Sequence, residues 1–151
     1  MKDEELLTNE LVEQVLTVLP MLPKKIFGAT PWVKNEDLHP SHFHVLHIVE
    51  HGSSIQMADI SNKLGITKSN LTPPLIQKLI EKNYIYKTKD ERDRRVTYID
   101  LTEKGKQFSK ENKAVLYKKV RDRFAVLSPE DKNDLNDAFT KINLILSNIE
   151  D

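Results

Sequence analysis

The 151-residue sequence predicts a mostly α-helical fold that contains one small β-hairpin. Three observations lead to this prediction. Apolar residues recur at helical spacing along most of the chain, glycines and prolines separate these stretches, and strand-favouring residues flank one charged cluster. No stretch reaches the roughly 20 apolar residues of a membrane span, and the acidic N-terminus lacks the apolar run of a signal peptide. We therefore expect no membrane partner.

The first 37 residues are expected to form a helix followed by a linker. Pro20 and Pro23 fall inside the helical pattern and predict a kink or a break, because proline lacks the amide hydrogen that a helix interior uses. The apolar stripe of this segment consists of Leu7, Leu11, Val15, Val18 and Leu22.

Two short helices are predicted next. The first begins at Pro40-Ser41 and ends before Gly52, and the second covers residues 57–64 and ends at Gly65. Their inward-facing residues are expected to be Phe43, Leu46 and Val49 in the first helix, and Ala58, Ile60 and Leu64 in the second.

A third helix is predicted over residues 68–82, directly after a tight turn at residues 64–67. Pro73 and Pro74 remove two amide donors within it, which usually costs ~3 kcal/mol and bends a helix. They either shorten the helix or set the angle of its first turns, and the sequence leaves both interpretations open. The predicted buried side consists of Leu71, Leu75, Leu79 and Ile80.

A charged cluster at residues 90–95 lies between two strand-favouring stretches, residues 84–88 and 96–99. β-branched and aromatic residues suit pleated strands, so we predict a two-stranded hairpin with a charged tip. After the second strand, Thr102 is expected to cap a helix that has Glu103 at its positive end. Two helices joined by a glycine-containing turn and followed by a hairpin describe a helix-turn-helix with a wing.

The charge distribution points to a nucleic acid as the partner. Residues 1–60 carry 4 basic and 9 acidic groups, residues 61–95 carry 9 basic and 4 acidic groups, and the remainder carries 10 of each. The basic excess therefore coincides with the third helix and the hairpin, where it forms an electrostatic footprint. Lysines scattered over a solvated helix face are the alternative explanation.

The solvent side of the third helix carries side chains that suit base edges and phosphates. We expect DNA contacts from Lys68, Ser69, Asn70, Thr72, Gln77 and Lys78.

Several motifs in residues 38–105 resemble the multiple antibiotic resistance regulator (MarR) family in their order and spacing. The resemblance implies a dimeric winged-helix regulator, most simply a repressor, that binds double-stranded operator DNA and responds to a small molecule. It also implies that Arg95 enters the minor groove, that Asp93 orients Arg95, and that Arg92 and Arg94 contact phosphate. The motifs are residues 38–46, Ala58-Asp59-Ile60-Ser61, Leu64-Gly65-Ile66-Thr67, Leu71-Thr72-Pro73, the cluster at 90–95 and Leu101-Thr102-Glu103-Lys104-Gly105.

The motif Leu71-Thr72-Pro73 is similar to the branch of that family that includes peroxide-sensing regulators, which use a cysteine. This chain contains no cysteine, so thiol sensing and disulfides are excluded, and a cytoplasmic location is allowed. The resemblance assigns residues 38–101 to DNA binding.

Residues 102–151 are expected to supply C-terminal dimerisation helices that act together with the N-terminal helix. Ser128 and Pro129 are predicted to open the last helix. A chain of this length cannot easily bury three terminal amphipathic helices by itself, so we expect a homodimer, with an intramolecular helical cap as the alternative. The two apolar stripes are Leu116, Val120, Phe124 and Leu127, then Leu135, Phe139, Ile142, Leu146 and Ile149.

All five histidines lie within residues 39–51, and His44, His47 and His51 are spaced to share one helix face. They are candidate zinc ligands for a metal-responsive regulator, and an exposed polar face is the simpler interpretation. Some family members sense zinc, but their sites also use the helix after the wing, and no histidine follows His51. A metal-dependent hydrolase would draw a base from Glu50 or Asp59, but the spacing His-Glu-x-x-His is absent, and we expect neither an enzyme nor a cofactor.

In the family, the effector commonly binds between the dimer helices and the DNA-binding part. The aromatic and polar residues near this junction are expected either to line such a pocket or to pack in the core. They are Phe27, Trp32, His42 and Phe43.

Overall fold

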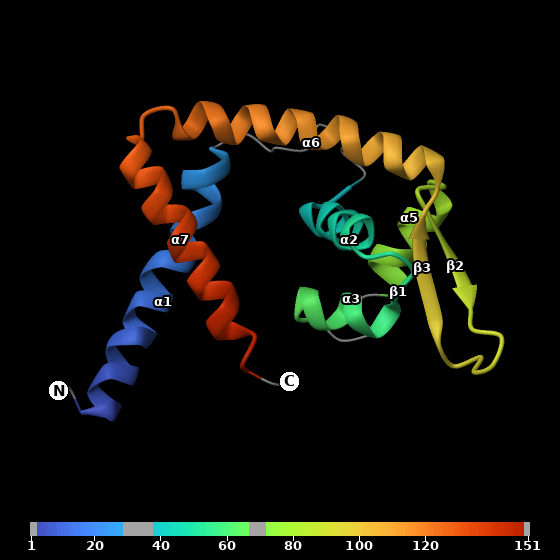
Figure 1. Cartoon of the computed structure of the whole chain (residues 1–151), viewed down its shortest axis with the longest axis horizontal. Helices are drawn as coiled ribbons and strands as arrows, with labels where there is room; N and C mark the ends of the chain where they lie inside the picture. Colours follow the sequence, from blue (N-terminus) through green and yellow to red (C-terminus); the bar gives the residue numbers. More distant parts are fainter. Residues whose placement is uncertain (1–2, 29–37, 67–71, 150–151) are drawn as a thin grey trace. The chain divides into compact units, whose positions relative to one another are not determined.

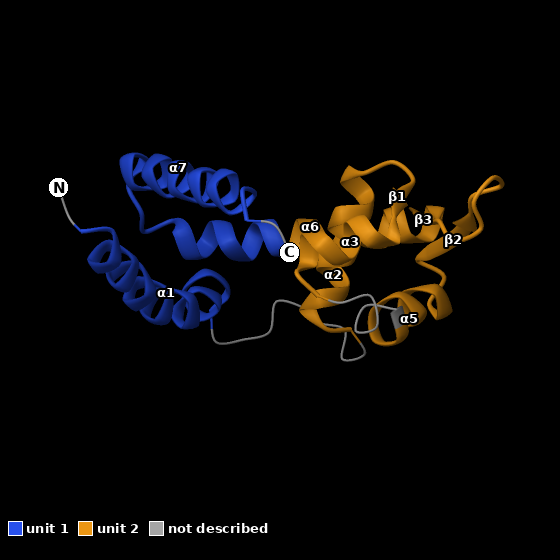
Figure 2. Ribbon diagram, turned by 90° about the horizontal axis from the view of Figure 1, so that it is seen from below, with its two compact units in different colours: residues 1–32, 116–150 blue, residues 33–115, 151 orange. Residues whose placement is uncertain are grey.

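The computed structural model describes residues 3–28, 38–66 and 72–149. The chain divides into two compact units (Figure 2). Unit 1 comprises Met1–Trp32 and Leu116–Glu150, and unit 2 comprises Val33–Val115 together with Asp151. In the described ranges, no helix is both long enough and apolar enough to cross a membrane.

Unit 2 contains the predicted short helices α2 (Pro40–His51) and α3 (Met57–Leu64), which end at Gly52 and Gly65. The third predicted helix begins, within the described residues, as a π-helical turn η1 (Thr72–Ile76) and continues as α5 (Gln77–Glu81). Its expected core residue Leu71 lies outside the described residues. The most deeply buried side chains of the unit are Val45, Leu46, Ile60, Ile76, Leu79, Ile85 and Ile99.

One inward-facing residue was predicted wrongly. Ala58 is exposed, whereas Met57 and Ser61 are buried together with Ile60 on the inner face of α3. Side chains two residues apart in a helix point about 200° apart around its axis, so Ala58 and Ile60 cannot share a face. The spacings of three and four residues from Met57 to Ile60 and Ser61 define the buried face instead.

The predicted two-stranded hairpin is confirmed, and a third strand that was not predicted extends it to a three-stranded antiparallel sheet. Strands β2 (Ile85–Lys89) and β3 (Thr97–Leu101) form the hairpin, and β1 (Ile55–Gln56) pairs with the other edge of β3. Ile55 lies opposite Ile99, and both side chains are buried. The hairpin therefore attaches to α3 through β1, and its loop extends away from α6 (Glu103–Phe124; Figure 1).

Thr102 caps the start of α6, as predicted. The hydroxyl of Thr102 accepts a hydrogen bond from the amide of Gly105 at 2.9 Å and donates one to the carbonyl of Asn83 at 2.6 Å. The amide of Thr102 also donates to the carbonyl of Tyr84 at 3.0 Å. Thr102 thus caps α6 and holds it against the chain that enters β2.

Unit 1 contains α1 (Glu4–Phe27), α7 (Pro129–Leu146) and the residues of α6 from Leu116 onward. Pro20 and Pro23 lie inside α1 and do not break it. The guanidinium of Arg123 donates to the carbonyl of Lys25 at 3.0 and 3.1 Å, which satisfies the negative end of this helix. Ser128 caps α7 by accepting a hydrogen bond from the amide of Asp131 at 3.0 Å, as predicted.

The apolar stripes of unit 1 are only partly covered by the chain itself. Neither α1 nor α7 contains a buried residue. The helices also end earlier than two stripes suggested, since Leu127 follows the end of α6 and Ile149 follows the end of α7. Large apolar side chains that are about half exposed or more include Leu6, Leu7, Leu11, Leu16, Leu19, Ile142, Leu144 and Ile145.

Candidate nucleic-acid interface

The loop at the tip of the wing is organised by the carboxylate of Asp90. One of its oxygens accepts hydrogen bonds from the amides of Arg92 at 2.8 Å and Asp93 at 3.0 Å. The other accepts the hydroxyl of Tyr98 at 3.1 Å. The hydrogen bond from the Asp93 amide contributes most to lowering the pKa of Asp90, so the carboxylate stays ionised at neutral pH. An acidic residue thus shapes a loop whose exposed side chains are mostly basic.

Asp93 and Arg95 form a two-pronged ion pair in this loop. Arg95 Nε lies 3.0 Å from Asp93 Oδ1, and Arg95 Nη2 lies 3.2 Å from Oδ2. The amide of Arg95 also donates to Asp93 Oδ1 at 3.1 Å, and the pKa of Asp93 is lowered chiefly by its side-chain contact with Arg95. The Arg95 side chain remains 91% exposed, so the pair orients the guanidinium without burying it.

The two other predicted wing arginines lie at the surface, as do two lysines that were not predicted as contacts. Arg92 and Arg94 are exposed in the loop, and Lys87 and Lys89 are exposed on β2. The wing therefore presents several cations around one oriented arginine, which suits a phosphate-lined groove.

The predicted contacts of the third helix fall partly outside the described residues. Lys68, Ser69 and Asn70 are in that undescribed part, and Thr72 begins η1. Gln77 is exposed and donates to Glu81 at 3.4 Å, while Lys78 is half-buried. Because Pro73 and Pro74 supply no amide hydrogen, their segment adopts a π turn instead of a regular α-helical one.

The buried side chain of His42 ties this π turn to the start of α2. His42 Nδ1 accepts the amide of His39 at 2.8 Å, so Nε2 must carry the proton and donates to the carbonyl of Pro74 at 3.1 Å. Burial lowers the pKa of His42, although the hydrogen bond to Pro74 opposes this change. The neutral imidazole is therefore a positioning group for the third helix, a role that was not predicted.

The residues expected near an effector lie in different surroundings. His42 and Phe43 are 5% and 8% exposed within unit 2, and the Phe43 ring lies 5.8 Å from that of Phe108. Phe27 is partly exposed in unit 1, and Trp32 is outside the described residues. Packing within unit 2 accounts for the burial of Phe43.

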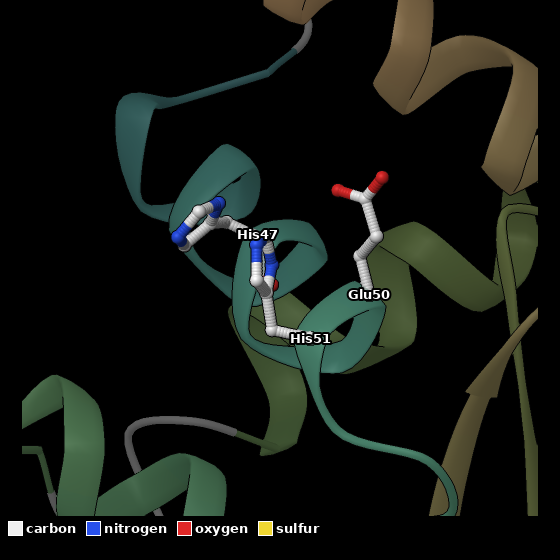
Figure 3. Close-up of side chains that lie close together, drawn as sticks. All are labelled: His47, Glu50 and His51. Atoms are coloured by element: carbon white, nitrogen blue, oxygen red, sulfur yellow. The ribbon is translucent and has the colours of Figure 1, made fainter.

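The potential metal ligands on the histidine-rich face of α2 differ from the predicted His44, His47 and His51. His47, Glu50 and His51 each offer a potential ligand atom, and these atoms lie within 4.8 Å of one another (Figure 3). His44 does not belong to this group, and Glu50 had been considered only as a catalytic base. The spacing His-x-x-Glu-His, which also occurs in metal sites, was the signal that could have identified the set.

The fold and the wing together define a winged helix-turn-helix protein of the DNA-binding class. The family model for the MarR family matches residues 38–97. The regulator SarZ of Staphylococcus aureus is 30% identical over 107 residues, which cover 71% of each chain. We conclude that this chain belongs to the MarR family, whose members are transcriptional regulators and not enzymes.

Two further comparisons differ in how much of each protein they cover. The regulator Hpr of Bacillus cytotoxicus is 34% identical over 76 residues, which are half of this chain but only 40% of Hpr. The structure of Streptococcus pneumoniae FabT in complex with DNA is 20% identical, covers 98% of this chain and 100% of FabT, and has a TM-score of 0.64. This last similarity establishes that the fold extends along almost the whole chain.

Proposed function

We propose that the protein is a homodimeric repressor that binds a specific double-stranded operator in the cytoplasm. The observation that carries this proposal is the exposed Arg95, which Asp93 holds in one orientation at the tip of the wing. An arginine presented in this way can enter a narrow minor groove, where the negative potential is enhanced. Arg92 and Arg94 would contact the phosphates beside it, and the third helix would enter the major groove.

Dimerisation is supported by the exposed leucines of α1 and the exposed apolar residues of α7. Apolar surface of this extent on two long helices is expected to be covered by association. A second copy of the chain offers the same stripes, so a symmetric pairing would cover both sets at once. Two wings related by a twofold axis would then read the two halves of a pseudo-palindrome.

Modulation by a small molecule is the third part of the proposal. An effector changes DNA binding only if it binds the competent and incompetent forms unequally, and a hundredfold preference corresponds to ~2.7 kcal/mol. Phe27 and Trp32 remain candidate contacts. His42 and Phe43 are already buried, so an effector that reached them would have to replace existing contacts.

The direct test selects the operator from random DNA and measures its affinity by fluorescence anisotropy. We expect a pseudo-palindrome with half-sites about 10–11 base pairs apart. If six to ten phosphates are contacted, affinity should fall roughly 10³–10⁵-fold between 50 and 200 mM salt. Selection of no shared sequence, or an affinity that hardly depends on salt, would refute DNA recognition.

Arg95→Ala tests the wing against a matched control. We expect it to weaken operator binding by roughly 10- to 100-fold, comparable to the loss of one good arginine contact. Arg121→Ala removes the same charge from an exposed position on α6 and should change affinity less than about twofold. Equal effects of the two substitutions would mean that only overall charge matters.

A further inference from the structure

Three side chains with metal-binding chemistry share one exposed face of α2. They are His47, Glu50 and His51. Glu50 and His51 follow His47 by three and four residues, so one helical turn brings them to the same face as His47 (Figure 3). The two imidazole rings are 4.2 Å apart between centroids. A pair of imidazoles at this spacing can chelate one ion, as it does in helical zinc motifs.

The hydrogen bonding of the histidines leaves nitrogen lone pairs available. His51 Nδ1 lies 2.9 Å from the carbonyl oxygen of His47, so it must carry the proton and act as the donor. In the neutral ring this leaves the lone pair on Nε2 of His51, which is the atom that would bind a metal ion.

Glu50 is already engaged by a cation. The ammonium of Lys113 forms an ion pair with Glu50 Oε2, and Ser109 Oγ donates to the same oxygen at 3.2 Å. Ser109 and Lys113 belong to the part of α6 that lies in unit 2. The carboxylate is thus held beside the histidine pair by a positive group.

We propose that His47, Glu50 and His51 form a site for a divalent transition metal ion, and that this ion and Lys113 compete for Glu50. Two imidazole nitrogens and one carboxylate oxygen are a donor set that suits zinc or nickel, whereas magnesium and calcium prefer oxygen ligands alone. Water would complete the coordination, because the three side chains lie at an exposed surface. All three ligands come from one helix, so the site does not require the dimer.

Competition for Glu50 would couple metal binding on α2 to the contact between α2 and α6. When metal takes the carboxylate, Lys113 loses its ion pair with α2, and the contact between the two helices weakens within unit 2. Any consequence for DNA affinity rests on the proposed function, but metal binding itself does not. The two are therefore tested separately, with no DNA in the metal titration.

The test titrates Zn²⁺ into the tag-free full-length protein by isothermal calorimetry. We expect one zinc per chain, and His47→Ala or His51→Ala should each weaken binding by roughly tenfold or more. His44→Ala is the matched control, since it removes a histidine from the same helix but outside the trio, and it should leave the affinity unchanged. Absence of zinc binding, or an equal loss in all three variants, would overturn the proposal.

Lys113→Met is the sharper test because it is expected to increase the affinity for zinc. Removing the competing ammonium should tighten zinc binding about two- to fivefold, the range expected from a partly exposed ion pair. Loss of folding cannot mimic a gain in affinity. Unchanged or weaker zinc binding in this variant would refute the competition.

Operator binding measured with a chelator present should be the same for His51→Ala and the unmodified chain, so failure of this site leaves the DNA-binding proposal intact.

Discussion

Gly105, at the start of α6, faces the carbonyl oxygen of Tyr84 so closely that a side chain cannot fit between them. A Cβ atom built on Gly105 would lie 1.9 Å from that oxygen. Both residues are buried, and the Thr102 amide also bonds to the Tyr84 carbonyl. Backbone lies on both sides of this contact, so a larger residue would force α6 and the entry to β2 apart.

We expect Gly105→Ala to lower the free energy of unfolding by about 3 kcal/mol or more, the upper end of the cost of overpacking. Gly65→Ala is the comparison, because Gly65 has a positive φ of 66° but no atom within 4 Å of an added Cβ. Backbone strain alone should cost that variant about 1–2 kcal/mol. Urea unfolding measures both values, and a smaller loss for Gly105→Ala than for Gly65→Ala would contradict the contact.

The pair formed by Asp93 and Arg95 predicts that their substitutions are not additive. Asp93→Ala removes the two-pronged contact and should weaken operator binding, because Arg95 must then be ordered when it binds. In the Arg95→Ala background the same substitution should have little further effect. A double-mutant cycle on operator affinity measures this interaction, and full additivity would show that Asp93 does not act through Arg95.

The Asp90 carboxylate accepts three hydrogen bonds in the wing loop, so removing all three should disorder the loop more than removing one. Asp90→Ala removes three acceptor contacts, whereas Tyr98→Phe removes only one of them. Amide hydrogen exchange at Arg92 and Asp93 should accelerate strongly in Asp90→Ala and much less in Tyr98→Phe. Operator affinity should fall in the same order, because a disordered wing must be ordered again when it binds DNA. Slow exchange in Asp90→Ala would contradict this role.

His42 predicts a dependence of stability on pH. Its pKa in the folded chain lies below the ordinary value of 6.5, so between these two values the unfolded chain binds more protons. Stability should therefore fall as the pH decreases below 6.5 and level off, as far as His42 is concerned, below its folded pKa. The positive groups that face it, His39 and Lys78, act in the same direction.

His42→Asn tests that dependence. Its amide oxygen can still accept from His39, but the shorter side chain cannot reach Pro74 and does not titrate. The slope of stability against pH should decrease in this variant and remain unchanged in the exposed control His44→Asn. Some slope should persist in both, since burial also lowers the pKa of His47. An unchanged slope in His42→Asn would exclude His42 as the titrating group.

The uncovered face of α1 predicts that association depends on a few leucines. Leu11 and Leu16 are 62% and 64% exposed, so glutamate at either position should be tolerated by the single chain but disfavoured in an apolar interface. We expect Leu11→Glu and Leu16→Glu to shift the protein to a monomer in sedimentation velocity. Val126→Glu, at a position 88% exposed and outside the helices, should not. Dimers that persist in both leucine variants would place the interface elsewhere.

The helices and the wing were predictable because local patterns specify them. The proline at the start of α2, the glycines after α2 and α3, and the capping residues Thr102 and Ser128 all act over a few residues. In contrast, β1 has only two residues and exists because Ile55 meets Ile99, a contact between segments far apart in the sequence. The inner face of α3 was also predictable from local spacing, because Ala58 and Ile60 are two residues apart and cannot lie on one face of a helix.

The side-chain contacts of the candidate interface were predictable to a similar extent, since only the local ones follow from the sequence. The pairing of Asp93 with Arg95 is local, so the family resemblance was sufficient to anticipate it. The contacts of His42 with Pro74 and of Glu50 with Lys113 join segments 32 and 63 residues apart, and no pattern within α2 could specify them. The group of His47, Glu50 and His51 is local, and its spacing His-x-x-Glu-His makes it predictable from the sequence.

The loop held by Asp90 has a consequence for the proposed recognition of DNA by the wing. Added salt weakens the attraction of the wing arginines to phosphate, but it has little effect on short hydrogen bonds inside the loop. The shape that the wing presents should therefore persist when the overall affinity has become low. As ionic strength rises, we expect binding to correct and incorrect sites to decline together, so that the preference of the wing for its groove is retained.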